Sequence, residues 1–235
     1  MLPVIILSGG LATRMHPITE TMPKGLICVA GKPFIEHQLE YLRNQKVKNV
    51  VLCLGHLGEM IEEVVGDGSE FNLNISYSYD GPSLLGTGGA IKKALPLIDG
   101  NFFVLYGDSF LPIDFGLINE KYKNSEKEGL MTVMKNQGRW DKSNVLFQNG
   151  TIIEYNKKST SSEMEHIDYG LSILSSETIA ERFKNTAAFD LAFLFQELAR
   201  QGMLEGFEVT RRFYEIGSKQ GLEETEEYFR GLKKL

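Results

Sequence analysis

The sequence predicts an α/β fold, with a doubly wound, mostly parallel sheet and a mixed second lobe in three α/β/α layers. Residues 3–127 alternate short apolar, β-branched runs with helical patterns, an order that produces parallel strands joined by crossover helices. From residue 130 onward, strand-like runs follow one another more directly. The chain has 235 residues, 42% of them hydrophobic, which suffices for one large α/β domain.

Four β-then-α units make up the first half. Their order implies parallel strands with crossover helices on both faces of the sheet. The predicted strand and helix pairs are 3–7 with 33–44, 49–54 with 57–65, 75–79 with 88–98, and 102–106 with 115–127. Such sheets bind ligands at the carboxyl ends of their strands, so the loops after the first and fourth strands are candidate sites.

The second half is expected to form a lobe packed directly on the first, because no linker-like segment separates them. The predicted strands are 130–135, 144–147, 151–155, 169–174, 207–209 and 213–216, and the predicted helices are 177–183, 189–200 and 221–233. We therefore expect a single domain over 1–235, with one lobe over 1–128 and the other over 129–235.

Charge and cysteine content restrict the partners and the compartment. The formal net charge is −6, so there is no bulk electrostatic reason to bind nucleic acid or an anionic membrane. Cys28 and Cys53 lie in apolar runs and are interpreted as buried thiols. The apolar run at residues 1–8 is too short for a signal peptide, and no stretch reaches transmembrane length. We expect a cytoplasmic protein.

The loop after the first strand carries the first motif. Residues 7–15 read Leu-Ser-Gly-Gly-Leu-Ala-Thr-Arg-Met, and Pro23 and Lys24 follow. Adjacent glycines let backbone N–H groups approach an anion, and Arg14 and Lys24 supply two cations for a triphosphate. The loop is neither a Walker A motif nor a dinucleotide fingerprint. For the glycine pair alone, a plain turn beside a solvated arginine is the alternative.

An acidic residue, Asp108, directly follows the fourth predicted strand. A carboxylate at the end of a buried strand costs desolvation energy unless a cation compensates it, and Mg²⁺ bridging phosphates is a natural partner. Helix capping is the alternative.

Residues 8–32 resemble the signature of the sugar-1-phosphate nucleotidyltransferase family, whose fold is related to that of the A-type glycosyltransferases. The match runs through Thr13, Arg14, Pro17 and Thr19 to Pro23, with Ala12 where glycine is common. The resemblance implies condensation of a nucleoside triphosphate with a sugar 1-phosphate, giving a nucleotide sugar and pyrophosphate. It also implies that residues 1–128 bind the nucleotide. The nucleotide contacts that it implies are Leu7, Ser8, Gly9, Gly10, Thr13, Arg14, Gly86, Thr87 and Gly88.

The same resemblance assigns the catalytic groups. It places Arg14 on the leaving pyrophosphate, Lys24 near the α-phosphate, and Asp108 on a Mg²⁺ ion that Mn²⁺ can replace. The second metal ligand of the family is an aspartate in an Asp-x-Gly-Thr segment. Residues 215–218 match that segment with glutamate in place of aspartate, which implies a metal site formed by Asp108 and Glu215.

The sugar-phosphate contacts are expected in residues 129–235. Residues 154–158 resemble the family's Glu-Lys-Pro segment, so Lys157 is the expected phosphate ligand, with Lys158 open as the alternative register. Residues 165–170 resemble the region that contacts sugar hydroxyls and imply Asp168 and Gly170. Trp140 either lines this pocket or covers the second lobe.

Within the family the chain looks most like D-glycero-D-manno-heptose 1-phosphate guanylyltransferases. Uridylyltransferases or other nucleotidyltransferases of hexose and amino-sugar 1-phosphates come next. A non-catalytic nucleotide-sugar-binding module is a rival from another class, although such a module is expected to lose Arg14, Lys24 or Asp108 first. A dinucleotide oxidoreductase is disfavoured because its glycine fingerprint is absent. We expect a monomer or a small homo-oligomer.

Overall fold

The first half of the chain folds as strand–helix units in the predicted order. The computed structural model describes residues 1–140, 142–159 and 161–232. The strands are β1 (Val4–Ser8), β4 (Asn49–Leu54), β5 (Asn74–Tyr79) and β6 (Asn101–Tyr106), and the helices are α1 (Phe34–Asn44), α2 (Gly58–Val65), α3 (Gly86–Ala94) and α4 (Phe115–Lys123). Asp114 begins α4, because its carboxylate accepts the N–H groups of Gly116 and Leu117.

The second half alternates less regularly. Its strands are β8 (Gly129–Lys135), β9 (Val145–Gln148), β10 (Thr151–Tyr155), β11 (His166–Ser175) and β12 (Leu204–Val209), and its helices are α5 (Ser176–Arg182), α6 (Ala192–Arg200) and α7 (Lys219–Leu232). The helix predicted over 189–200 begins only at Ala192, because Phe189 contacts the first turn of α3. Residue 233, the last of the predicted C-terminal helix, lies outside the described residues.

Two short ladders complete the structure. β2 (Cys28–Val29) pairs with β3 (Lys32–Pro33), and β7 (Ser109–Phe110) pairs with β13 (Tyr214–Glu215). Only β13 was predicted, as part of a strand over 213–216, since two-residue strands carry no periodicity. The β7–β13 ladder matters for the site because it joins the segment after β6 to the segment before α7.

A single nine-stranded sheet passes through both halves, in the order β5-β4-β1-β6-β11-β8-β12-β10-β9. The first four strands are mutually parallel, and β11 joins them antiparallel to β6. β4 and β6 flank β1 on opposite sides, so successive units extend the sheet in opposite directions from this point. The crevice outside the carboxyl ends of β1 and β6 is therefore where such a sheet binds ligands.

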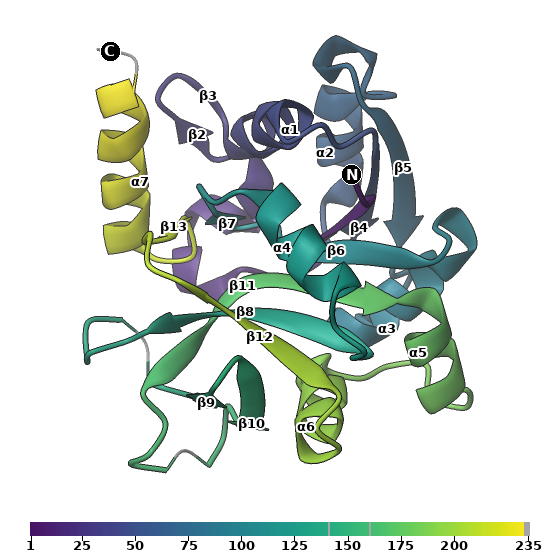
Figure 1. Ribbon diagram of the computed structural model, residues 1–235. Coiled ribbons are helices and arrows are strands. Elements are labelled where there is room, and N and C mark those ends of the chain that lie inside the picture. The colour runs from purple at the N-terminus through teal and green to yellow at the C-terminus, as the bar shows by residue number, and fades with distance from the viewer. Residues whose placement is uncertain (141, 160, 233–235) are drawn as a thin grey trace.

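Helices cover both faces of the sheet (Figure 1), which confirms the predicted layered α/β fold. Side chains along β1 alternate between the two helix layers. Val4 and Ile6 belong to the core cluster that includes residues of α1, α2 and α4, whereas Ile5 belongs to the cluster that includes residues of α3, α5 and α6. All three side chains are fully buried, as expected for a parallel strand with helices on both faces.

A third apolar cluster packs α7 against the segment that follows β1. Its buried members are Met15, Ile27, Val29, Ala30, Phe34, Phe110, Ile216 and Phe229. One cysteine prediction was wrong here: Cys53 is buried, but Cys28 is exposed. Successive residues of a strand point to opposite faces, and in β2 it is Val29 that points inward.

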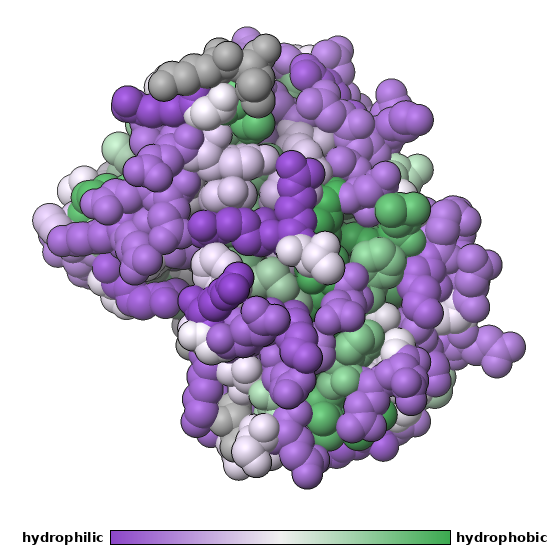
Figure 2. Space-filling model, turned by 60° about the vertical axis from the view of Figure 1, so that its left-hand side comes forward, coloured by the Kyte–Doolittle hydropathy of each residue, from purple (hydrophilic) through white to green (hydrophobic). Residues whose placement is uncertain are grey.

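The molecular surface is largely hydrophilic on the face drawn in Figure 2, where apolar side chains reach the surface mainly in one band. Exposed apolar residues of this kind are normal for a folded chain. Among the helices described, none is both long and apolar enough to cross a membrane.

Candidate active site

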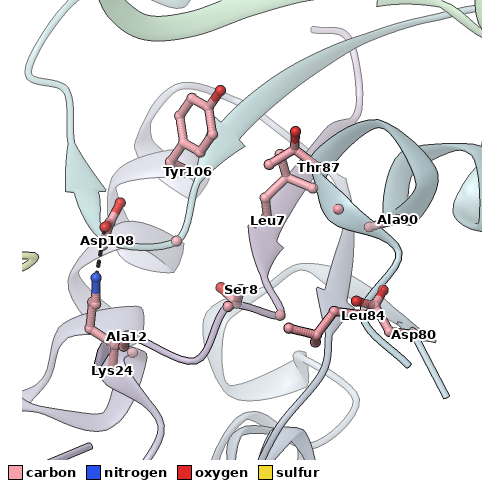
Figure 3. Close-up of a pocket in the computed structure, with 15 residues that line it drawn as sticks. Leu7, Ser8, Ala12, Lys24, Asp80, Leu84, Thr87, Ala90, Tyr106 and Asp108 are labelled. Atoms are coloured by element: carbon pink, nitrogen blue, oxygen red, sulfur yellow. Dashed lines mark hydrogen bonds and ion pairs between the residues drawn. The ribbon is translucent and has the colours of Figure 1, made fainter. Parts of the chain in front are cut away.

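A first cavity of about 250 Å³ opens at the carboxyl ends of β1 and β6. Figure 3 shows the side chains that line it. Eight of the predicted site residues lie on its wall, namely Leu7, Ser8, Gly9, Gly10, Lys24, Gly86, Thr87 and Asp108. The structure thus brings residues up to about a hundred positions apart together in the crevice at the carboxyl ends of β1 and β6.

One side of this cavity is charged. The Lys24 ammonium lies 3.0 Å from Asp108 Oδ2, and the two groups form the ion pair drawn in Figure 3. Asp108 is fixed by the backbone around it, because the N–H of Ile216 donates to its carbonyl oxygen at 3.0 Å. An ammonium in this position could bind phosphate oxygens, and the carboxylate beside it could bind a metal ion.

The opposite side is mostly apolar and contains one unpredicted acid. Leu84, Ala90 and Asp80 lie there, away from the Lys24–Asp108 pair (Figure 3). Asp80 is only 8% exposed. Burial raises the pKa of its carboxyl above the usual value, and the N–H of Leu85 and the Lys93 ammonium oppose this rise. Asp80 directly follows the third predicted strand, much as Asp108 follows the fourth, and this position is the signal that could have marked it.

The glycine-rich loop has a defined backbone shape. Ala12 has φ of +51°, in the left-handed region where glycine has no steric penalty and alanine has a small one. The hydroxyl of buried Thr19 donates to the Ala12 carbonyl at 2.9 Å. Thr13 and Arg14 follow as exposed residues. Thr13 lines neither cavity described here, and Arg14 lines the second cavity rather than the first.

The second cavity is larger, about 570 Å³, and it shares Tyr106 and Asp108 with the first. The predicted residues on its wall are Arg14, Asp108, Lys157, Asp168, Gly170 and Glu215. Residues predicted for the sugar phosphate and for the metal therefore meet in one space. Lys158 is not on this wall; its ammonium lies 6.0 Å from the centre of the Phe193 ring.

Asp168 is held in place at the floor of the second cavity. The Gly170 N–H donates to its Oδ1 at 3.0 Å, and the Tyr155 hydroxyl to its Oδ2 at 3.3 Å. Burial raises the pKa of Asp168, while the charge of Lys157 and the two hydrogen bonds lower it. Gly170 has φ of +107°, which requires glycine. Lys157 lies about 6 Å from the rings of Tyr106 and Tyr155.

Trp140 also lines the second cavity. Its ring lies 4.7 Å from the guanidinium carbon of Arg212, and the Tyr214 ring lies 4.6 Å from the same atom. Arg212 also pairs with Glu224. No pattern in the sequence predicts this aromatic and guanidinium stack, because Trp140 lies far along the chain from the segment that contains Arg212 and Tyr214.

Asp108 and Glu215 fit the oxygen chemistry of a divalent metal. A Cβ added to Gly217 would lie 2.7 Å from Glu215 Oε2 and 3.2 Å from Asp108 Oδ2, so the two carboxylates converge on one small volume. Glu215 is held by the N–H of Gly217 and the hydroxyl of Ser218. Within the described residues no group of three or more metal-ligating side chains occurs. Mg²⁺ commonly uses one or two carboxylates and takes its other ligands from water and phosphate.

Gly88 has a different contact from the one expected. Its N–H donates to the Phe189 carbonyl at 2.9 Å, and the N–H of Gly89 points to the same oxygen. A Cβ at Gly88 would lie 2.2 Å from the Phe189 ring. The first turn of α3 therefore holds the segment before α6, and only Gly86 and Thr87 of the predicted trio line the cavity.

Gly107 provides a test of the close approach between β1 and β6. A Cβ at this position would lie 1.9 Å from Ser8 Oγ, a buried atom with no hydrogen-bond partner among the described residues. We expect Gly107→Ala to lower the free energy of unfolding by about 1–3 kcal/mol, and Ser8→Ala to restore part of the loss while having little effect alone. Urea unfolding of the four proteins measures this. Equal losses with and without Ser8→Ala would instead attribute the clash to the Leu7 carbonyl, 2.9 Å away.

Comparison with known proteins shows which family the chain belongs to. Residues 3–144 match the model of the nucleotidyl transferase family, and they contain the whole first cavity. The chain belongs to this family.

Several relatives agree with this membership. D-glycero-α-D-manno-heptose 1-phosphate guanylyltransferase of Aneurinibacillus thermoaerophilus is 30% identical, over 91% of the chain and 92% of the relative. N-acetylmuramate α-1-phosphate uridylyltransferase of Neisseria meningitidis is 43% identical over 47% of the chain. HddC from Yersinia pseudotuberculosis, solved with GMP-PN, superposes with a TM-score of 0.81 and 25% identity, covering 97% of the chain and all of HddC.

The chain spans only about half the length of several relatives that it matches, because the matched regions cover 48%, 49% and 55% of three of them. The relatives also differ in both nucleotide and sugar. Membership of the family thus leaves the activity and the substrates to be argued from the site.

Proposed function

We propose that the chain is a metal-dependent sugar-1-phosphate nucleotidyltransferase. One observation carries the proposal: two cavities meet at Asp108, one formed by the glycine-rich loop and the other lined by Lys157 and Asp168. A reaction between two phosphorylated substrates needs two adjoining sites with the reacting groups at their junction. We assign the first cavity, within the lobe 1–128, to the nucleoside triphosphate. The second, formed largely by the lobe 129–235, takes the sugar 1-phosphate.

The reaction needs positioning and charge neutralisation rather than a covalent enzyme intermediate. An oxygen of the sugar phosphate attacks the α-phosphorus in line, a new P–O bond forms, and the bond to the β-phosphate oxygen breaks as pyrophosphate leaves. Lys24 neutralises charge at the α-phosphate, and Lys157 holds the attacking phosphate. Arg14 neutralises the pyrophosphate as its charge develops.

Asp108 and Glu215 would hold Mg²⁺, or Mn²⁺ in its place. The bound ion supplies positive charge to phosphate oxygens. The Lys24 ammonium pairs with Asp108, so it would share this carboxylate with the ion. Because the reaction consumes a nucleoside triphosphate, we also propose that it takes place in the cytoplasm.

The leading candidate for the substrate pair is GTP with D-glycero-D-manno-heptose 1-phosphate, which is the chemistry named for a relative matched over 91% of the chain. The second candidate is UTP with an amino-sugar 1-phosphate, as named for the Neisseria relative. Pyrophosphate release from each of the four nucleoside triphosphates with a panel of sugar 1-phosphates tests the proposal. Absence of release from every pair, together with intact binding of a nucleotide sugar, would favour a non-catalytic binding module.

Lys157 provides a test of the division between the cavities. A phosphate monoester approaching a bound triphosphate meets like-charge repulsion, and Lys157 is the cation on its side. We expect Lys157→Ala to weaken sugar phosphate binding by on the order of tenfold or more while the affinity for triphosphate stays nearly unchanged. Titration calorimetry with each substrate measures both affinities.

Lys158→Ala is the matched control, because Lys158 points toward Phe193 instead of the cavity. It is expected to leave both affinities unchanged. An effect of Lys158→Ala without one of Lys157→Ala would shift the assignment by one residue. Weakened triphosphate binding with normal sugar phosphate binding in Lys157→Ala would exchange the two cavities.

A further inference from the structure

Asp80 is a buried acid in the first cavity for which the reaction described above has no use. It follows β5 directly, lines the apolar side of the cavity and is 8% exposed. A Cβ added to Gly9 would lie 3.4 Å from Asp80 Oδ2, so the carboxylate faces the glycine-rich loop. It also lies on the opposite side from the Lys24–Asp108 pair (Figure 3), the side where a bound nucleotide would place its base.

The carboxylate retains unused acceptor capacity. In the described part of the chain, its hydrogen-bond donor is the N–H of Leu85, at 3.2 Å from Oδ2. Lys93 donates to the backbone carbonyl of Asp80 at 3.2 Å, not to the side chain. An ionised carboxylate offers two oxygens with about four acceptor positions and no donor. A ligand group that fills the remaining positions must present N–H or O–H groups.

The nucleobases differ in how well they meet that requirement. On its pairing edge guanine presents two adjacent donors, N1–H and N2–H₂, which match the two oxygens of a carboxylate. Uracil presents one donor between two carbonyl acceptors, and adenine and cytosine each place a ring-nitrogen acceptor beside their amino group. An acceptor facing an acceptor leaves both buried groups unpaired, which disfavours these three bases.

We propose that Asp80 selects guanine, its carboxylate accepting from N1–H and N2–H₂, so that GTP is the nucleotide substrate. This inference rests on the proposed function, since it takes the first cavity as the triphosphate site. The apolar side chains of Leu7, Leu84 and Ala90 line the same cavity, and apolar surroundings of this kind increase the penalty for a mismatched base.

Asp80 also stabilises the turn before α3 through Leu85, and the test must separate this role from base selection. Asp80→Asn keeps an acceptor oxygen for the Leu85 N–H but replaces the other oxygen with a donor. Inosine triphosphate makes the matching change in the ligand, because it lacks the N2 amino group and keeps N1–H. Loss of the carboxylate and loss of the amino group should therefore not have additive effects.

Titration calorimetry without sugar phosphate measures the binding of GTP, inosine triphosphate, UTP, CTP and ATP. For the wild type we expect GTP to bind on the order of tenfold more tightly than each of the other four. In Asp80→Asn the ratio of GTP to inosine triphosphate affinity should fall to near one. Asp67→Asn, at an exposed carboxylate outside both cavities, should keep the wild-type ratio.

The outcomes distinguish this inference from the proposed function. Equal affinities of the wild type for all nucleotides, or a preference for GTP that Asp80→Asn leaves intact, would overturn the role of Asp80. Tight binding of UTP with pyrophosphate release from UTP would overturn the guanine assignment but leave the proposed function in place. Failure of every triphosphate to bind would reject both.

Discussion

Removal of divalent metal with EDTA is expected to abolish pyrophosphate release, and Mg²⁺ or Mn²⁺ to restore it. The carboxylates of Asp108 and Glu215 converge within a few ångströms of Lys24, and without a metal ion both would repel the phosphates of a bound triphosphate. With the ion present, the same carboxylates hold the positive charge that the phosphates need. Full turnover in metal-free buffer would refute the assignment.

Substitutions of Glu215 test the proposed metal site at a single residue. Glu215→Gln removes the negative charge at nearly constant shape and should lower turnover by on the order of a hundredfold or more. Glu215→Asp restores the family's own residue and should retain substantial activity. Since Glu215 also holds the backbone of Gly217 and the hydroxyl of Ser218, the thermal unfolding midpoint must be measured alongside turnover. Comparable turnover in the two variants would show that the charge at this position is not required.

The strand–helix units were predictable because their apolar runs alternate between two helix layers. Val4, Ile5 and Ile6 read as one apolar run, and that is the pattern of a strand buried on both faces. Element ends were less predictable where a tertiary contact decides them. The start of α6 at Ala192 depends on Phe189, whose carbonyl accepts N–H groups of α3 about a hundred residues earlier in the chain.

The candidate site was predictable where a motif marks it, as at Lys24 and Asp108. It was not predictable where single residues from distant segments meet. Asp80 follows a strand as Asp108 does, but its burial against the loop containing Gly9 cannot be read from the sequence. Arg212 and Trp140 come from distant segments, one before α7 and one after β8, and only the tertiary fold brings them into contact.

The backbone path of the glycine-rich loop is another feature of the site that the sequence does not predict. Ala12 adopts a left-handed conformation, and the chain then turns so that Arg14 reaches the second cavity. A sequence motif predicts that such a loop exists. The direction of each side chain depends on the backbone angles, which contacts such as the hydrogen bond from the Thr19 hydroxyl to the Ala12 carbonyl stabilise.

Arg14→Ala is expected to lower turnover by on the order of a hundredfold with the fold retained. Arg14 is exposed, so its removal costs no core packing, and a guanidinium that neutralises charge developing on pyrophosphate acts mainly in the transition state. Steady-state kinetics with each substrate varied in turn, beside thermal unfolding, measures the effect. Arg200→Ala, at the exposed end of α6, is the matched control and should be unchanged in both.

The kinetic pattern of Arg14→Ala also decides between two positions for the guanidinium. Arg14 borders the second cavity together with Asp108 and Glu215, so it can reach either the pyrophosphate or the sugar phosphate. A fall in kcat with little change in either KM supports the pyrophosphate assignment, because only an interaction that grows in the transition state is lost. A rise in the KM for sugar phosphate alone would move Arg14 to the side of Lys157. Unchanged turnover would remove this arginine from catalysis altogether.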